Sequence, residues 1–322
     1  KGAIIAGSPD GTEHAKYQER EKIWKFKSPP INRLHRVLVE ELVYNIAVQL
    51  GFKDAVTTVV GRVNGKAGVF TEWIDGDSLW DEVNRYGDDF VRHLSKAFLK
   101  RIVKEQVLDW LVSQHDSHAG SFLKSNDGQS IYPIDKGQAF KYLGVKGDKT
   151  EERLSTEYNP NSEINGLDIH YVPIYNLVLK AIAEGKASLT LKEAWDEIYP
   201  VMKAVKDMDI DKYEDLLRPY AIFRFEVNRS SEEKIKNAEE FLKLARKRKE
   251  NLPNDFYEFY TKHLGLKPDV YINDAGEIII SKDVKAVIAD LVGTLAARGM
   301  SISQETADLL RDLDKDGIRI II

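Results

Sequence analysis

Two short stretches decide how this sequence is interpreted: DWLVSQHDSHAGSFL at residues 109–123 and IYPIDKGQAF at residues 131–140. The first starts as the end of an apolar, helix-patterned segment and passes through a polar loop into a strand-like piece. The second is a short apolar strand that ends at Asp135. Residues 126–128 (NDG) separate the two pieces and are typical of a turn. This order places the carboxylates of Asp116 and Asp135 at neighbouring strand or loop ends.

Two carboxylates in this arrangement suit phosphoryl transfer. One carboxylate orients and deprotonates the attacking hydroxyl, and the other holds the magnesium ion that bridges the phosphates. Ser121 comes at the far end of the loop that begins at Asp116, where its hydroxyl offers a second oxygen ligand. The same stretch contains no set of three side chains with the spacing of a zinc site.

The loop resembles that of HipA-type kinases, which carry an Asp-x-His-x-x-Asn-Phe loop followed by an Asp on a short apolar strand. Here the loop is DSHAGSF at residues 116–122, and IDKG at residues 134–137 is also similar to the phosphatidylinositol 4-kinase pattern. The resemblance implies that Asp116 is the catalytic aspartate and that His118 hydrogen-bonds within the catalytic loop. It also makes Asp135 the principal Mg²⁺ ligand, aided by Ser121, which replaces the usual Asn and is a weaker ligand.

A kinase also needs a lysine on a strand of its small lobe, positioned by a helix carboxylate, to hold the ATP phosphates. The segment WKFK at residues 24–27 offers Lys25 and Lys27, which lie on the same strand face by parity. The resemblance favours Lys25, whereas a competing alignment favours Lys27. In the following helix the resemblance favours Glu40 as the partner carboxylate.

The backbone of a hinge strand is expected to meet the adenine ring. Glu72, Trp73 and Ile74 fall where that strand should end. The glycine-containing turn at residues 7–11 stands where a loop could cover the phosphates, although it matches the usual glycine-rich pattern poorly.

The order of elements predicts an α+β, bilobal, protein-kinase-like fold. We expect a β-rich N-lobe at residues 1–75 with one helix, a mainly helical C-lobe at residues 76–266 and an appendage at residues 267–322. The patterns behind this division are strands at 3–6 and 22–27, a helix at 33–50, a hairpin formed by 55–63 and 66–74, a largely buried helix at 98–112, short strands at 121–123 and 131–134, a polar loop at 144–166, helices from 172 to about 264, and a hairpin at 270–280 followed by one or two helices and an Ile-rich tail.

The composition excludes several classes of protein. The chain has 322 residues and a formal net charge of −5, which does not favour nucleic acid as a partner. It contains no cysteine, which rules out disulfides and fits the reducing conditions of a cytoplasmic protein. No apolar stretch is long enough to span a membrane. The chain opens at Lys1 without a signal-type segment, so we expect a trimmed rather than a secreted form.

The first functional hypothesis is therefore that the chain is an ATP- and Mg²⁺-dependent kinase that phosphorylates a protein on Ser or Thr. Residues 141–166 fall where an activation segment would lie and are candidates for autophosphorylation. The HipA resemblance leaves room for an antitoxin-like or assembly partner.

Two other hypotheses for the function stay open. One is a small-molecule or lipid phosphotransferase, although aminoglycoside-type enzymes usually carry His where this chain has Gln114. The other is a nucleotide-binding pseudokinase or assembly module. Ser121 favours this reading, and so does the appendage, whose residues 299–307 resemble tail segments of phage portal proteins.

Overall fold

The computed structural model divides into two compact units, Lys1–Leu266 and Lys267–Ile322. The residues that the structure describes are 3–7, 12–19, 22–30, 33–114, 116–141, 143, 169–227, 235–267, 270–272, 278–280, 286–288 and 319–321. Most of the expected activation segment, the turn at residues 8–11 and the portal-like stretch at 299–307 lie outside the described residues.

The first unit begins with an antiparallel five-stranded sheet in the order β1-β2-β3-β5-β4. Its strands are β1 (Ala3–Gly7), β2 (Glu13–Glu19), β3 (Lys22–Ser28), β4 (Thr58–Val63) and β5 (Lys66–Glu72). The predicted hairpin is confirmed, because Asn64 and Gly65 both have the positive φ angles that a tight β4–β5 turn requires. Strand β2 was not predicted, since its largely polar sequence lacks a strand signal and its pairing with β3 holds it in the sheet.

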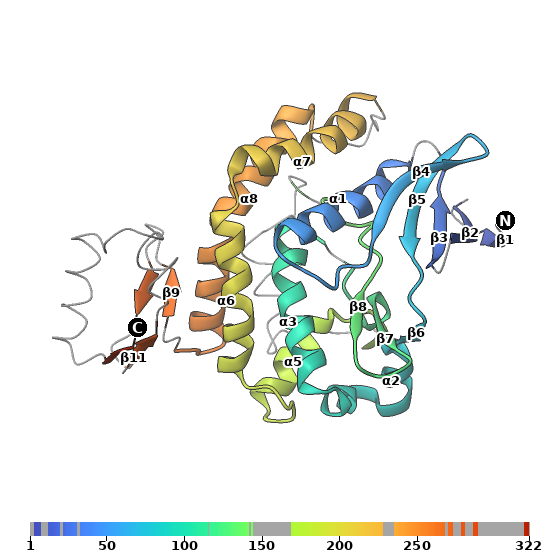
Figure 1. Cartoon of the computed structure of the whole chain (residues 1–322). Coiled ribbons are helices and arrows are strands. Elements are labelled where there is room, and N and C mark those ends of the chain that lie inside the picture. Colours follow the sequence, from blue (N-terminus) through green and yellow to red (C-terminus); the bar gives the residue numbers. More distant parts are fainter. Residues whose placement is uncertain are drawn as a thin grey trace. The chain divides into compact units, whose positions relative to one another are not determined.

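One helix, α1 (His35–Gln49), packs against β4 and β5 of this sheet (Figure 1). Leu34 and Val37 from the start of the helix join Val69 of β5 in a buried apolar cluster. Apolar residues recur along the buried side of this helix, as the predicted helix at 33–50 requires. Because this packing fixes the rotation of α1, it also decides where Glu40 points.

The rest of the first unit is mainly helical, as predicted. Its α-helices are α2 (Leu79–Tyr86), α3 (Lys96–Leu111), α5 (Ile174–Ala183), α6 (Leu191–Asp207), α7 (Ile210–Ile222) and α8 (Ala238–Glu258). Helix α3 runs through the middle of this part and contacts α5, α6 and α8 (Figure 1). Ser95 caps its N-terminus by accepting a hydrogen bond from the backbone of Phe98. The helix is therefore a buried support from which the next loop emerges.

A small antiparallel sheet follows α3 in the order β6-β7-β8. Its strands are β6 (Gly76–Ser78), β7 (Phe122–Ser125) and β8 (Ile131–Pro133), which confirms the two short strands expected on either side of residues 126–128. Phe122 pairs with Pro133 in the β7–β8 ladder. Ser121 and Ile134 are consequently cross-strand neighbours, and the Ile134 N–H donates to the Ser121 carbonyl at 2.8 Å.

The described parts of the second unit are two pairs of short strands. The antiparallel pair β9 (Val270–Ile272) and β10 (Ile278–Ile280) confirms the predicted hairpin. The parallel pair β11 (Ala286–Ile288) and β12 (Arg319–Ile321) was not predicted, because it joins segments far apart in the sequence. The helices expected between them fall outside the described residues.

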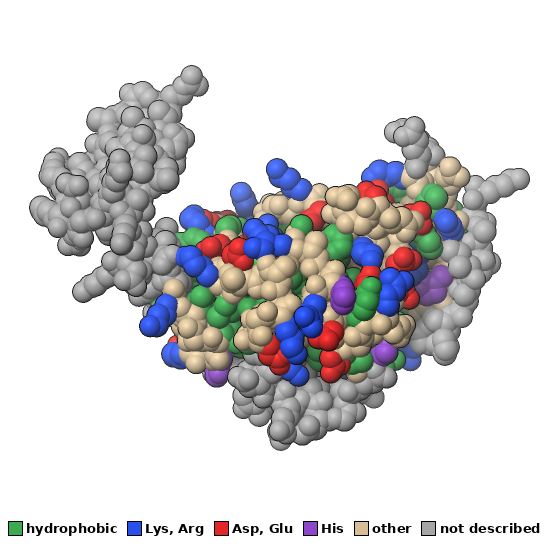
Figure 2. Space-filling model, turned by 90° about the horizontal axis from the view of Figure 1, so that it is seen from below, with side chains coloured by type: hydrophobic (Ala, Val, Ile, Leu, Met, Phe, Trp, Pro, Cys, Tyr) green, Lys and Arg blue, Asp and Glu red, His purple; other side chains and the backbone are tan. Residues whose placement is uncertain are grey.

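The predicted fold class is confirmed: a small β-sheet region with one helix precedes a larger helical part. None of the described helices combines the length and apolar character that crossing a membrane requires. On the face shown in Figure 2, lysine and arginine side chains are interspersed with aspartate and glutamate over the described residues.

Candidate active site

The structure brings Lys27, Glu40 and Asp135 together from three separate elements. The Nζ atom of Lys27, near the end of β3, donates to Oε1 of Glu40 on α1 at 2.7 Å. The same atom donates to Oδ1 of Asp135, just after β8, at 3.2 Å. One cation therefore joins the sheet, the helix and the segment that follows the small hairpin.

The lysine that pairs with Glu40 is Lys27, whereas the resemblance favours Lys25 as the lysine that holds the ATP phosphates. Both side chains project from the same face of β3, but two residues along a strand move a side chain by about 7 Å. Lys27 lies opposite Val69 in the ladder with β5, whereas Lys25 lies opposite Thr71 and is exposed. The alternation of side chains along β3 shows that both lysines lie on one face of the strand. Only the packing of α1 determines which of them pairs with Glu40.

The three charges differ in their exposure to water. The Asp135 side chain is 59% exposed, that of Lys27 25% and that of Glu40 9%. The positive charge of Lys27 lowers the pKa of Asp135. Burial would lower the pKa of Lys27, but Glu40 and Asp135 outweigh it and raise that pKa. Burial raises the pKa of Glu40, and Lys27 offsets only part of this effect.

Gly137 allows the close approach of α1 to the Asp135 segment. A Cβ atom at this position would lie 3.1 Å from the Arg36 carbonyl oxygen and 3.1 Å from Oε1 of Glu40. Such contacts are tighter than ordinary van der Waals separation. The glycine in the IDKG segment thus has a steric role, because a larger residue would press on the carboxylate that holds Lys27.

The backbone at Asp135 is held in an unusual conformation. Asp135 has a φ of 57°, in the left-handed region that few residues other than glycine adopt. The side-chain amide of Gln114 donates to the Asp135 carbonyl at 3.0 Å and helps to fix this turn. The turn leaves the Asp135 carboxylate exposed, whereas the side chain of the next residue, Lys136, is largely enclosed and only 11% exposed. No local sequence pattern marks Gln114 for this structural role.

The loop after α3 places Asp116 beside His118. Nε2 of His118 lies 3.6 Å from Oδ1 of Asp116, and its Nδ1 accepts a hydrogen bond from the Gly120 N–H at 3.0 Å. Because Nδ1 is an acceptor, the neutral ring carries its proton on Nε2, facing Asp116. The ring also stacks on Trp80 with centroids 5.2 Å apart. His118 is thus fixed inside the loop, where it can orient the exposed Asp116 carboxylate.

Ser121 closes the same loop from its other end. Its hydroxyl donates to the Asp116 carbonyl oxygen at 2.7 Å, so the side chain first serves to hold the loop. The hydroxyl oxygen keeps lone pairs after this donation and can still ligate a cation. Ser121 lies across the β7–β8 ladder from Ile134, next to Asp135. The two residues proposed as metal ligands therefore project from one end of the hairpin.

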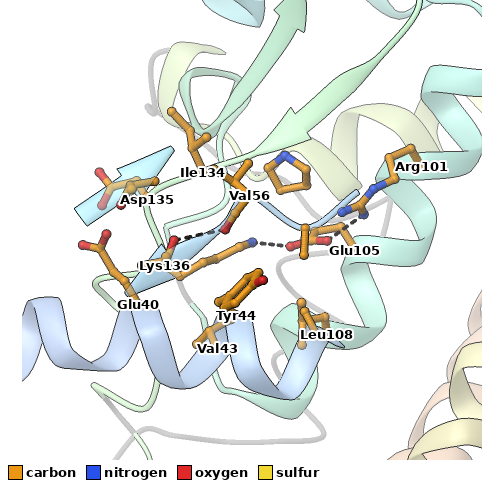
Figure 3. A pocket seen from close by; sticks show the side chains of 15 residues that line it. Glu40, Val43, Tyr44, Val56, Arg101, Glu105, Leu108, Ile134, Asp135 and Lys136 are labelled. Atoms are coloured by element: carbon orange, nitrogen blue, oxygen red, sulfur yellow. Dashed lines mark hydrogen bonds and ion pairs between the residues drawn. The ribbon is translucent and has the colours of Figure 1, made fainter. Parts of the chain in front are cut away.

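A buried ionic network lies behind this site and was not anticipated as functional. Nζ of Lys136 donates to Oε1 of Glu105 at 2.6 Å and to Oδ1 of Asp109 at 2.5 Å, both on α3. Arg101 donates to the same Glu105 side chain at 2.7 Å (Figure 3). Burial would lower the pKa of Lys136, but Asp109 and Glu105 outweigh it and raise that pKa. The available sequence signal was a pair of acids one turn apart on an apolar helix face.

The residues expected at the hinge follow β5 but are already engaged with the sheet. The Glu72 N–H donates to the Thr57 carbonyl and the Trp73 N–H to the Ile23 carbonyl, both at 2.8 Å. The Glu72 side chain pairs with Lys22 at 2.9 Å. Trp73 is exposed and Ile74 is half-buried. The structure thus does not bring the side chains of these three residues to the Lys27 cluster.

A small cavity of about 40 Å³ lies between α1, α3, β4 and the Asp135 segment. Apolar side chains such as Val43, Tyr44 and Leu108 line it together with Glu40 and Lys136 (Figure 3). It has room for a few water molecules at most. It is therefore a space behind the ion cluster and is too small to accommodate a nucleotide.

Among the residues that the structure describes, no three His, Asp or Glu side chains form a ready-made metal cluster. The donors at the hairpin end nevertheless suit Mg²⁺, which prefers carboxylate and hydroxyl oxygens and keeps water or phosphate in its other positions. Asp135 offers an exposed carboxylate and Ser121 a hydroxyl oxygen. These residues fit a magnesium ion that arrives together with phosphate ligands.

No protein-family model matches the sequence, and no curated protein matches it. Among solved structures, the chain is similar to that of CtkA, a proinflammatory kinase of Helicobacter pylori, with a TM-score of 0.51 and 16% identity over 82% of this chain and 96% of that one. Spectinomycin phosphotransferase APH(9)-Ia, in complex with ADP and spectinomycin, gives a TM-score of 0.28 and 10% identity over 77% and 93% of the two chains. The similarity to CtkA shows that the fold is kinase-like.

Proposed function

We propose that this chain is an ATP- and Mg²⁺-dependent phosphotransferase. The observation that carries the proposal is the position of Lys27 between Glu40 on α1 and Asp135 after β8. A kinase-like site needs a lysine for the phosphates, a helix carboxylate to position it and an aspartate for the metal. The kinase-like fold supports the same assignment.

In this proposal Lys27 holds the ATP phosphates while Glu40 keeps its ammonium group in place. Asp135 would hold the metal through its carboxylate, and Ser121 would add its hydroxyl oxygen. When bound, Mg²⁺ neutralises charge on the phosphates. Two observations support these roles for Lys27 and Asp135: the Asp135 carboxylate is exposed, and its Oδ1 atom lies 3.2 Å from Nζ of Lys27.

Asp116 is the proposed base. Its carboxylate accepts the proton of the acceptor hydroxyl as that oxygen forms a bond to the γ-phosphorus. The bond between the γ-phosphorus and the bridging oxygen breaks, and the electron pair leaves with ADP. His118 orients the carboxylate from 3.6 Å, and the bond from Ser121 to the Asp116 carbonyl holds the loop during the transfer.

For the acceptor, the resemblance to HipA-type kinases favours a Ser or Thr hydroxyl of a protein. The exposed position of Asp116 supports an acceptor that approaches from solvent. The expected autophosphorylation of residues 141–166 belongs to this proposal. The phosphatidylinositol 4-kinase-like IDKG segment keeps a lipid hydroxyl as the next acceptor to test.

Ser121 favours a second candidate, a chain that binds nucleotide without transferring phosphate. A serine hydroxyl is a weaker Mg²⁺ ligand than the amide oxygen usual at this position in HipA-type kinases, and here it is also used to hold Asp116. The two candidates differ in whether bound ATP is turned over.

Calorimetric titration of ATP into the whole chain, with and without Mg²⁺, tests the nucleotide site. We expect binding that Mg²⁺ strengthens and that Asp135→Asn makes insensitive to the metal. Lys27→Met should weaken binding in both conditions. If ATP does not bind under either condition, the phosphotransferase proposal is wrong.

A further inference from the structure

Two carboxylates lie on the buried face of α3, the helix that leads into the candidate catalytic loop. The side chains of Glu105 and Asp109 are 2% and 0% exposed. Burying a carboxylate is costly unless it is paired and hydrogen-bonded, so a helix needs a reason to retain two of them. That reason lies in what the carboxylates contact.

Asp109 contacts both segments that carry a candidate catalytic aspartate. Its Oδ2 atom accepts hydrogen bonds from the hydroxyls of Ser117 and Tyr175, each at 2.5 Å. Its Oδ1 atom accepts from Nζ of Lys136 at 2.5 Å. Ser117 directly follows Asp116, and Lys136 directly follows Asp135. One buried carboxylate thus ties together the two segments.

Lys136 is held from a second direction as well. Its Nζ atom donates to Glu105 at 2.6 Å, and Glu105 is itself held by Arg101 (Figure 3). The left-handed backbone of Asp135 sends the Asp135 carboxylate outward and the Lys136 side chain inward. Any displacement of the Lys136 side chain would therefore move the adjacent Asp135.

We propose that Asp109 and Lys136 are positioning residues for phosphoryl transfer, because the buried pair fixes Asp116 relative to Asp135. This inference rests on the proposed function. Neither side chain needs to touch ATP, the metal or the acceptor. Misplacement of a reacting group by about 1 Å can reduce turnover roughly a hundredfold, so this control of position has a kinetic effect.

Replacing Asp109 or Lys136 directly leaves an unpaired buried charge and risks unfolding. The sharper test compares Ser117→Ala with Tyr175→Phe, since each removes one hydroxyl from the same Asp109 oxygen. Ser117 lies in the catalytic loop, whereas Tyr175 lies on α5, which touches that loop through the Ile174 N–H and the Ser117 carbonyl but carries no residue of the proposed site. The measurements are kcat and KM for ATP in Mg²⁺-dependent phosphate transfer, together with the thermal unfolding temperature of each variant.

We expect Ser117→Ala to lower kcat about tenfold with KM for ATP nearly unchanged, and Tyr175→Phe to keep kcat within about twofold. Ser117→Thr, which retains the hydroxyl, should recover much of the lost kcat. Both deletions should lower the unfolding temperature by similar amounts. If the wild type transfers phosphate and kcat falls equally in Ser117→Ala and Tyr175→Phe, or falls in neither, the positioning role is wrong while the proposed function stands. If the folded wild type transfers no phosphate, both the positioning role and the proposed function are wrong.

Discussion

Lys27 and Asp135 are 108 positions apart in the sequence, and their side chains form an ion pair of 3.2 Å in the structure. The pair joins the N-terminal sheet to the segment that follows the small hairpin. Glu40 completes it from α1 at 2.7 Å. The charge of Lys27 is thus balanced by two carboxylates. In the proposed function, the ATP phosphates would compete with these carboxylates for Lys27, and the metal would compete with Lys27 for Asp135.

Lys27→Met should lower kcat/KM for ATP by about a hundredfold or more, because it removes the cation that Glu40 and Asp135 hold for the phosphates. Lys25→Met is the matched control on the same strand face, and its effect should stay within about threefold since the side chain is exposed. Steady-state kinetics of the two variants measures both values. The reverse order would restore Lys25 as the phosphate lysine.

Gly137→Ala should reduce activity more than it reduces stability. The added methyl group would meet Oε1 of Glu40 at 3.1 Å and push it away from Lys27. In a background of Lys27→Met the same change should cost little further activity, because the ion pair that it disturbs is already gone. Additive losses in this double-mutant cycle would show that Gly137 acts elsewhere.

Ser121→Asn should lower the Mg²⁺ concentration needed for half-maximal activity, and Ser121→Ala should raise it. An amide supplies both an N–H for the Asp116 carbonyl and an oxygen for the metal, whereas alanine supplies neither. A shift of about tenfold in either direction corresponds to roughly 1.4 kcal/mol. Magnesium titrations of turnover give the comparison, and an unchanged Mg²⁺ requirement in Ser121→Ala would remove Ser121 from the ligand set.

The stability of the chain should depend on pH through His35 at the start of α1. Burial, helped by Arg224 and Arg36, lowers the pKa of His35 from 6.5 to about 4. Between these values the unfolded chain binds a proton that the folded chain does not, so the free energy of unfolding falls as pH falls from 6.5 to 4. Urea unfolding at several pH values in this range should show that the free energy of unfolding depends less steeply on pH in His35→Gln than in the wild type. An NMR titration that gave His35 a pKa near 6.5 in the folded chain would contradict this prediction.

The sequence predicted the features that depend on local pattern. The β4–β5 hairpin follows from Asn64 and Gly65, and α3 follows from apolar residues at helical spacing. The loop from Asp116 to Ser121 and the strand that ends before Asp135 were also found from spacing and turn residues. Strand β2 escaped prediction because neighbouring strands, not its own composition, determine its conformation.

Features that depend on tertiary packing could not be read in the same way. Lys25 and Lys27 share a strand face, and the position of α1 alone decides which one meets Glu40. The network of Glu105, Asp109 and Lys136 appears in sequence as ordinary charged residues. Its signal was the location of two acids on a helix face that is otherwise apolar, which is informative only once that face is known to be buried.

Incubation of the purified chain with Mg²⁺ and ATP labelled on its γ-phosphate, beside an Asp116→Ala variant, measures whether phosphate is transferred and whether transfer needs Asp116. Asp116 is exposed, so the substitution should leave the fold intact. We expect the wild type to transfer label to a Ser or Thr hydroxyl, on itself or on an added protein, and the variant to transfer none. Binding of ATP without any transfer would contradict the proposed function and identify the chain as a nucleotide-binding module.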